Sequence, residues 1–273
     1  MKKCLIIMLL PVFLYACAVV KDNVRETETE SDEFSSLQLR EVQVETKNGS
    51  IESSVWDDDR IYVTFEKWAT GGNTQDAEDN LKDIEIHIDE DTESGTLSIE
   101  VDAPIRPGTN YGCNVSLNLP ASLSLNLRSS NGAVRVSESQ NNLECSTSNG
   151  SITIEDTSGY ARLKTSNGKI TVQNHNGELN GKTSNGAIDA DIVLSENGEC
   201  LLKTSNGAIT LSISEETSAI VGASTSNGKI EVDDLGITLI RMEKTEFEGT
   251  MGNGDGNIEL GTSNGSIHIK GRL

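Results

Sequence analysis

Hydrophobic and polar residues alternate along most of this chain, and the alternation is centred on a recurring Ser-Asn-Gly triplet. Apolar or small residues stand six and four positions before the Asn of each triplet and three and five positions after it. A period of two is typical of β-strands that bury one face. Each triplet is therefore predicted to join two half-buried strands. The Asn of the triplet recurs at Asn131, Asn149, Asn167, Asn185, Asn206, Asn227 and Asn264.

The spacing of the triplets predicts an all-β repeat fold. The steps are 18, 18, 18, 21, 21 and 37 residues, and the last step predicts one degenerate copy within residues 237–254. An eighth, outlying copy carries Asn48. In the triplet, Gly is expected to supply backbone angles that other residues avoid, and Asn to tolerate the left-handed region.

Two architectures fit these turns. Asn-Gly between alternating strands suits an antiparallel meander of hairpins. Alternatively, each 18–21 residues form one coil of a parallel β-helix, or β-solenoid. A Thr or Ser recurs two residues before each Asn, which a hairpin does not require. In stacked coils the same side chain at the same position of each coil is stabilising, since like side chains can hydrogen-bond along the axis. The solenoid is therefore favoured, with the seven Asn residues as a structural ladder.

The N-terminal half is less regular and is predicted to cap one end of the solenoid. Strands are expected around residues 39–53 and 60–68, followed by a short helix in "TQDAEDNLKDI" with Thr74 as its N-cap. "IEIHID" and "TLSIEVD" then form a predicted hairpin across Glu93-Ser94-Gly95. Residues 36–128 are thus assigned to an N-terminal β-rich part, and residues 129–273 to the Ser-Asn-Gly repeat solenoid.

The first residues form a targeting segment. A basic "MKK" precedes a short apolar stretch that ends in "LYAC" at Cys17. This resembles a bacterial lipobox, although Tyr15 is bulkier than usual there. We expect a lipoprotein signal peptide at residues 1–16, a lipid on Cys17, and a flexible acidic tether over residues 17–35. The alternative is an ordinary secretory signal with an incidental Cys. Ala18 favours the outer membrane or cell surface over the inner membrane.

The formal net charge is −21, which argues against nucleic acid or anionic lipid as a partner. Three Cys residues follow the signal, with wide spacing and no Cys-x-x-Cys, so neither a disulfide framework nor a zinc site is expected. Cys145 and Cys200 fall in the apolar columns, and Cys113 shares the parity of its apolar neighbours. All three are predicted to be small core residues.

Candidate chemistry is sparse. His87 and His268 are predicted to face solvent on strands, and His175 to lie in a surface turn. "MGNGDGNIEL" carries Asp255 but occurs once, so a Gly-rich turn is favoured over a calcium site. The acidic run Asp57–Asp59 is expected to be a solvated turn, with a weak cation site as the alternative.

A carbohydrate-cleaving β-helix is the enzyme alternative, because such chemistry needs carboxylates that converge on one outward face. Asp189 and Glu231 are predicted to lie about two coils apart, roughly 10 Å, with Thr210 between them. No aromatic residue flanks this pair to hold a sugar. The sequence therefore favours a protein without catalytic residues.

Several segments together resemble the putative-adhesin family of bacterial β-strand repeat domains, a domain of unknown function. They are "VETKNGSIES", "NVSLNLP", "SLNLRSSNGAVRV" and "FEGTMGNGDGNIELGTSNGSIHI", and the similarity covers roughly residues 36–273. The resemblance implies a right-handed β-helix-like fold on exported or membrane-attached proteins, and it supplies no catalytic residues. Lys47 departs from the Ser of the later triplets, so the corner at Asn48 is the least certain to stack.

We therefore expect an exported, membrane-anchored lipoprotein of the cell envelope with a display, adhesion or structural role, and no cofactor. Its expected partners are the membrane, through the N-terminal lipid, and a protein or glycan ligand of unknown identity, with no nucleic acid. An acidic envelope protein that binds cationic peptides is the second hypothesis. A glycan-active β-helix enzyme is the third.

Overall fold

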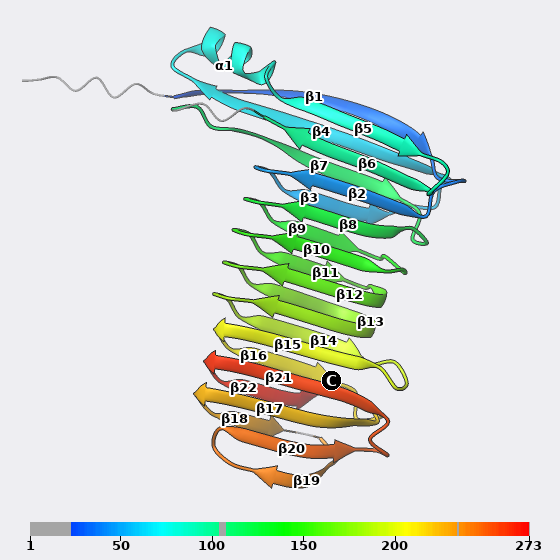
Figure 1. The fold of residues 1–273 in the computed structure, drawn as a ribbon, viewed down its shortest axis with the longest axis vertical. Helices are drawn as coiled ribbons and strands as arrows, with labels where there is room; N and C mark the ends of the chain where they lie inside the picture. The colour runs from blue at the N-terminus through cyan, green and yellow to red at the C-terminus, as the bar shows by residue number, and fades with distance from the viewer. Residues whose placement is uncertain (1–22, 104–107, 234, 273) are drawn as a thin grey trace, which may run out of the picture.

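The computed structural model describes residues 23–103, 108–233 and 235–272, and these form a β-solenoid whose strands stack into two facing layers (Figure 1). The predicted fold class is confirmed. The triplets are corners between the layers, because the strand before each Asn lies in the first layer and the strand after it in the second. Neighbouring coils pair in parallel and in register, as between β10 (Leu143–Thr147) and β12 (Ser158–Thr165).

The first layer holds the strands that precede the triplets. From the N-terminal end its order is β5 (Glu85–Asp91), β6 (Thr96–Asp102), β2 (Glu41–Thr46), β8 (Ser124–Ser129), β10, β12, the second half of β13 (Ile170–Thr183), β15 (Glu199–Asn206), β21 (Gly256–Asn264), β17 (Ala219–Asn227), β20 (Glu246–Met251) and β19 (Ile237–Met242).

The second layer holds the strands that follow the triplets. Its order is β1 (Val24–Ser35), β4 (Arg60–Gly71), β7 (Tyr111–Leu119), β3 (Ile51–Val55), β9 (Val134–Ser137), β11 (Ile152–Glu155), the first half of β13, β14 (Ile188–Val193), β16 (Ile209–Ile213), β22 (Ile267–Gly271) and β18 (Ile230–Asp233).

One hydrophobic core runs between the layers from end to end. The alternation seen in the sequence produces it: in β16, Ile209, Leu211 and Ile213 are fully buried while the residues between them point outward. Complete burial of one such side chain contributes about 1.5–3 kcal/mol. Cys113, Cys145 and Cys200 lie in this core as predicted.

The Gly of each triplet is required for a reason that the sequence did not reveal. Gly168 and its equivalents do not have the left-handed backbone that was expected. Instead, a Cβ at Gly168 would lie 1.8 Å from the carbonyl oxygen of Gly150 in the adjacent coil. The residue two before the Asn adds a second contact, since Thr165 Oγ1 donates to that same Gly150 oxygen at 2.9 Å. The Thr column thus bonds to the neighbouring backbone and does not pair with itself.

The C-terminal coils do not stack in chain order. The coil of β21 and β22 lies between the coil of β15 and β16 and the coil of β17 and β18. The predicted degenerate repeat over residues 237–254 is therefore wrong. That segment forms β19 and β20, an antiparallel hairpin that covers the end of the first layer beside β17. The hairpin carries the chain back so that its last coil can enter the stack (Figure 1).

The N-terminal end is built differently. β1, β4 and β7 pair antiparallel, and β5 and β6 form the predicted hairpin. The flexible tether expected over residues 17–35 is incorrect for residues 24–35, because they form β1 and pair along their whole length with β4. This strand was missed because its polar residues show no apolar period. The corner at Asn48 does stack, against the coil of Asn131.

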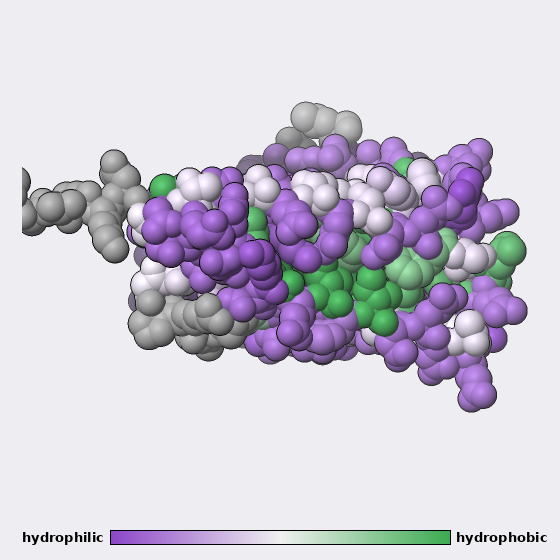
Figure 2. All heavy atoms as spheres, turned by 90° about the horizontal axis from the view of Figure 1, so that it is seen from above, coloured by the Kyte–Doolittle hydropathy of each residue, from purple (hydrophilic) through white to green (hydrophobic). Residues whose placement is uncertain are grey.

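The single helix in the described part of the chain is α1 (Thr74–Leu81), which packs against β4 and β1 at the N-terminal end. Its N-cap is Asn73, one residue before the predicted Thr74, and the Asn73 side chain accepts from the backbone N–H of Asp76. Seen from this end, hydrophilic residues frame a hydrophobic strip between the two layers (Figure 2). Phe34, Ile86 and Ile88 are half-buried against the core there.

Candidate functional site

The seven predicted Asn residues are joined by side-chain hydrogen bonds in the order in which the coils stack. Each Nδ2 donates to the Oδ1 of the preceding Asn at 2.7–2.9 Å, and the series begins at Asn48. Asn264 stands between Asn206 and Asn227, so the ladder itself records the insertion of the last coil. These side chains therefore join successive coils of the scaffold.

The carboxylates of the enzyme hypothesis do not converge. Because the last coil intervenes, Asp189 and Glu231 lie three coils apart, about 14 Å, and not two. Each is also neutralised by a lysine: Lys169 Nζ lies 2.5 Å from Asp189, and Lys229 Nζ lies 2.5 Å from Glu231. No pair of acid and base is formed at these positions.

Two of the candidate cation ligands, Asp255 and Asp58, contact other side chains. Asp255 accepts a hydrogen bond from Ser218 Oγ at 2.7 Å. In the loop at Asp57–Asp59, Asp58 lies 3.3 Å from Arg60. Within the described ranges, no three His, Cys, Asp or Glu side chains gather closely enough to hold a metal ion.

His175 is not the surface residue that was predicted. It lies in the core at the second corner of its coil, where Nδ1 is 2.9 Å from Thr157 Oγ1 and Nε2 is 3.1 Å from the Glu178 carbonyl oxygen. Burial lowers the pKa of His175 below its ordinary value. Hydrogen bonds with neighbouring backbone groups oppose this shift. The imidazole is thus a neutral core residue, which a turn-like sequence could not indicate. His87 is exposed, as predicted, and His268 is half-exposed with Nε2 2.8 Å from Asp233.

Cys113, Cys145 and Cys200 are buried free thiols. Desolvation raises the pKa of Cys113 and of Cys200 to about 12 and also raises that of Cys145. A thiol with so high a pKa supplies almost no thiolate at neutral pH, and the thiolate is the reactive form. Cys17, the predicted lipidation site, lies outside the described residues, and no described helix is long and apolar enough to cross a membrane.

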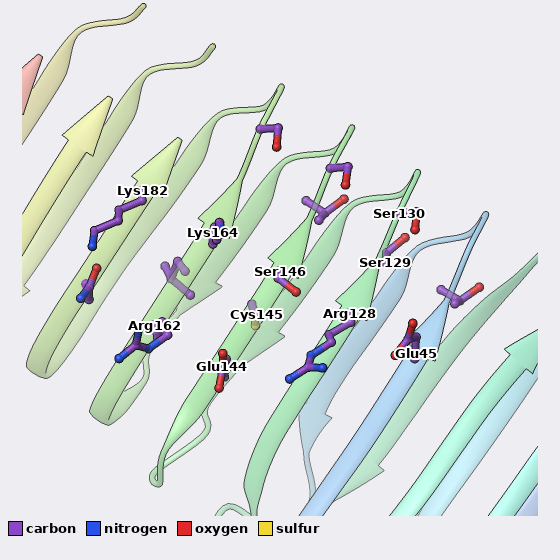
Figure 3. A pocket seen from close by; sticks show the side chains of 16 residues that line it. Glu45, Arg128, Ser129, Ser130, Glu144, Cys145, Ser146, Arg162, Lys164 and Lys182 are labelled. Carbon is purple, nitrogen blue, oxygen red and sulfur yellow. The ribbon is translucent and has the colours of Figure 1, made fainter. Parts of the chain in front are cut away.

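A shallow hollow of about 550 Å³ lies on the outside of the first layer (Figure 3). It crosses β2, β8, β10, β12 and the second half of β13. Ser146 is a short side chain between Arg128 and Lys164 in the neighbouring strands, which leaves the surface recessed. We call the four exposed cations of the hollow the basic row: Arg128, Arg162, Lys164 and Lys182.

The cations of the basic row form no ion pair within the described chain, although the strand register places Glu45 opposite Arg128 and Glu144 opposite Arg162. Lys164 and Lys182 have no carboxylate opposite them. Arg128 Nε donates to Asn126, and Arg162 lies over the ring of Tyr160. On the second layer, by contrast, Arg135 pairs with Glu52 at 2.9 Å and Lys169 pairs with Asp189.

The negative charge is concentrated elsewhere. Residues 23–102 contain 23 acidic and 6 basic residues, whereas residues 103–273 contain 19 and 13. The acidic residues surround the N-terminal end of the stack, where hydrophilic side chains dominate the surface (Figure 2). The net charge of −21 is therefore distributed unevenly along the chain.

The basic row was not predicted, because the outward positions considered in the sequence were those after each Asn. The relevant signal lies three residues before the Asn, where Arg128, Lys164, Lys182 and Lys203 recur. Strand alternation places this position outward on the first layer. The recurrence of these cations can be read from the sequence. Their lack of ion pairs can be seen only in the structure, and it is this lack that distinguishes the row from most other cations.

Family comparison agrees with the architecture. The model of the Toastrack DUF4097 family, a domain of unknown function, matches residues 32–270, and the chain belongs to this family. No curated protein matches the chain.

Solved structures with a similar fold each cover 90% of this chain. One is a putative cell adhesion protein from Clostridium sporogenes, at 13% identity, a TM-score of 0.39 and 100% coverage of that chain. A putative adhesin from Bacteroides fragilis has 12% identity, a TM-score of 0.44 and 97% coverage. A putative lipid binding protein from Parabacteroides distasonis has 12% identity, a TM-score of 0.34 and 97% coverage.

Proposed function

We propose that this protein is an exported, lipid-anchored β-solenoid of the cell envelope that displays a binding surface and performs no catalysis. The observation that carries the proposal is the rigid array on the first layer. The Asn ladder and the Thr-to-backbone bonds hold its strands in register, so the exposed side chains keep fixed spacings. A surface of this kind suits an extended partner that contacts several coils at once.

The proposed anchor fits the position of the first strand. β1 begins at Val24, so only six residues separate it from Cys17. Six extended residues span about 20 Å at most. Lipid on Cys17 would hold the N-terminal end near the membrane and leave the basic row further out.

Substitution of Cys17 tests the anchor. We expect Cys17→Ser to abolish incorporation of labelled fatty acid and to release the protein from the membrane fraction. Cys4→Ser is the matched control, because Cys4 lies earlier in the signal, and it should change neither measurement. Retention of both label and membrane association by Cys17→Ser would contradict the proposal. Digestion of the chain by protease added to intact cells would support surface display over a periplasmic location.

Absence of catalysis is tested at the carboxylates named above. Asp189→Ala combined with Glu231→Ala should leave the turnover of envelope glycans unchanged in cells. A loss of turnover with normal protein levels would restore the enzyme hypothesis. Because both side chains are paired with lysines on the surface, the double variant should remain folded.

A second candidate function is favoured by the acidic N-terminal end. Its excess of carboxylates could hold cationic peptides through charge, and such binding weakens sharply as ionic strength rises. Asp89→Asn with Glu90→Gln on β5 should then weaken peptide binding measurably. Unchanged binding, or binding insensitive to salt, would remove this candidate.

A further inference from the structure

Three lysines stand in direct register on the first layer. Lys164 pairs with Lys182 across β12 and β13, and Lys182 pairs with Lys203 across β13 and β15. Adjacent strands are about 4.8 Å apart, so each ammonium group has a like charge beside it. Like charges directly opposite one another destabilise a sheet. Among the described strand pairs, these are the only two that place a cation against a cation.

Carboxylates do not relieve this repulsion at the centre of the column. Lys203 reaches Glu259 in the next coil at 2.7 Å, but Lys164 and Lys182 have no such partner in the described chain. Most other cations on the described strands pair with carboxylates, even across coils, as Arg135 does with Glu52, whereas Arg25 and Lys270 do not. Lys164 and Lys182 therefore remain adjacent and without ion pairs, although the chain contains many carboxylates.

Hydroxyl and amide groups border the same hollow. The Ser of each triplet is exposed along the corner edge, and Ser130, Ser148 and Ser166 line the hollow beside the lysines. Asn180 lies on the other side, next to Arg162 in register. Such groups donate to and accept from a polyhydroxylated ligand, while the lysines meet its anionic groups.

We propose that the basic row and Lys203 bind a linear acidic polysaccharide that lies along the stack axis, across the strands. Anionic groups of the polymer would lie between successive lysines and cancel their repulsion, and sugar hydroxyls would bond to the serine edge. The ligand class rests on the display role proposed above and gives that role a specific partner.

Other polyanions fit the hollow less well. Single-stranded nucleic acid requires aromatic side chains on which successive bases stack. The aromatic side chain beside the row, Tyr160, already carries Arg162 over its ring. Anionic membranes are usually bound where basic and apolar side chains lie together. Large exposed apolar residues such as Leu239 and Ile240 lie on β19, far along the stack from the hollow.

Binding of polygalacturonate by the full chain, purified in a neutral detergent, tests the proposal by calorimetric titration. We expect binding that weakens as salt is added, and no comparable binding of the fully methyl-esterified polymer. Lys164→Glu with Lys182→Glu should weaken binding at least about tenfold, because two contacts become repulsive. Lys169→Glu with Lys270→Glu is the matched control: it has the same net charge, but its changes lie on the second layer. Thermal unfolding of both variants checks that they are folded.

Equal affinity of the wild-type chain and Lys164→Glu/Lys182→Glu would overturn the proposal. So would equal loss in both double variants, which would indicate only a net-charge effect, or equal binding of the esterified polymer. Tighter binding of single-stranded DNA or of anionic lipid vesicles would assign the row to those partners instead. The anchor is tested separately: membrane retention of Cys17→Ser would contradict the display proposal and leave the polymer affinities unaffected.

Discussion

The N-terminal end and the repeat stack of this molecule share one core but differ in both construction and charge. The end is made of antiparallel strands and a helix and carries most of the net negative charge. The stack is parallel, is joined by the Asn ladder, and carries the basic row. Lys182 lies four coils from β2, about 19 Å away. Exposed charges are screened over about 8 Å at physiological ionic strength.

A net charge therefore does not describe the partners of an elongated protein. The value of −21 argued against anionic ligands when it was taken as a property of the whole chain. Once the charges are placed along the stack, the acidic N-terminal end and the basic row differ in the sign of their local charge. The two regions can then bind partners of opposite charge without interfering.

The largest expected effect is at the triplet glycine, where the backbones of neighbouring coils approach most closely. Gly168→Ala places a Cβ 1.8 Å from the Gly150 oxygen, so two coils must separate. We expect a loss of about 3 kcal/mol or more in unfolding free energy, comparable to other overpacked sites. Gly222→Ala in β17 is the control, because its Cβ would meet nothing closer than 3.9 Å. Denaturant titration of both variants measures this, and equal losses would show that the close approach is not decisive.

The ladder gives a smaller and graded effect. Asn167→Ala removes two side-chain hydrogen bonds, to Asn149 and from Asn185. Asn48→Ala, at the border with the N-terminal end, removes the one bond from Asn131. At about 1 kcal/mol per bond, the interior variant should lose about 2 kcal/mol and the border variant about half of that. Equal losses in chemical denaturation would contradict a continuous ladder.

Removal of one lysine from the like-charged column should raise the stability of the fold, whereas the preceding variants lower it. Lys182→Gln removes the like-charge contacts with Lys164 and Lys203, so in the absence of ligand it should raise stability by a few tenths of a kcal/mol. The rise should be visible as a higher melting temperature at low ionic strength and should vanish in high salt. Lys169→Gln, which breaks an ion pair, should not stabilise. A fall in stability for Lys182→Gln would show that this lysine is structural.

The smallest expected effect is on pH dependence. The folded pKa of His175 is lowered, so the unfolded chain binds a proton more readily than the folded one. Stability from this residue is complete above the unfolded pKa of about 6.5 and is lost as pH falls below it. His175→Gln should flatten the decline between pH 7 and pH 5. An unchanged profile would show that other groups, such as the acidic end, govern it.

The sequence predicted much of the fold because the determinants are local. Period-two alternation around each triplet identified the strands, the buried face and the corners, and the register of Thr165 and its equivalents favoured stacking over hairpins. β1 was not predicted, because its acidic residues are ordered by β4 and not by burial of their own side chains.

The order of the coils could not be predicted for a related reason. Every triplet presents the same surface to its neighbours, so Asn206 can accept the coil of Asn264 as readily as that of Asn227. Only the hairpin of β19 and β20 decides between them, and its residues resemble a poor repeat. The basic row was missed for a simpler reason, since its outward position on the first layer was not followed.

The inserted C-terminal coil also bears on how the chain folds. Coils that stack in chain order can be added as soon as they are synthesised, because their contacts are local. The coil of β17 and β18 has its partner in residues 256–271, which are made only after it and after the hairpin of β19 and β20. Until then its inner edge is unpaired, and an unpaired edge invites aggregation. Residues 124–213 should therefore fold early, and the coil of β17 and β18 should join the stack late. Truncated or unfinished chains would expose an unpaired strand edge at this point. We expect a protease to remove such chains first.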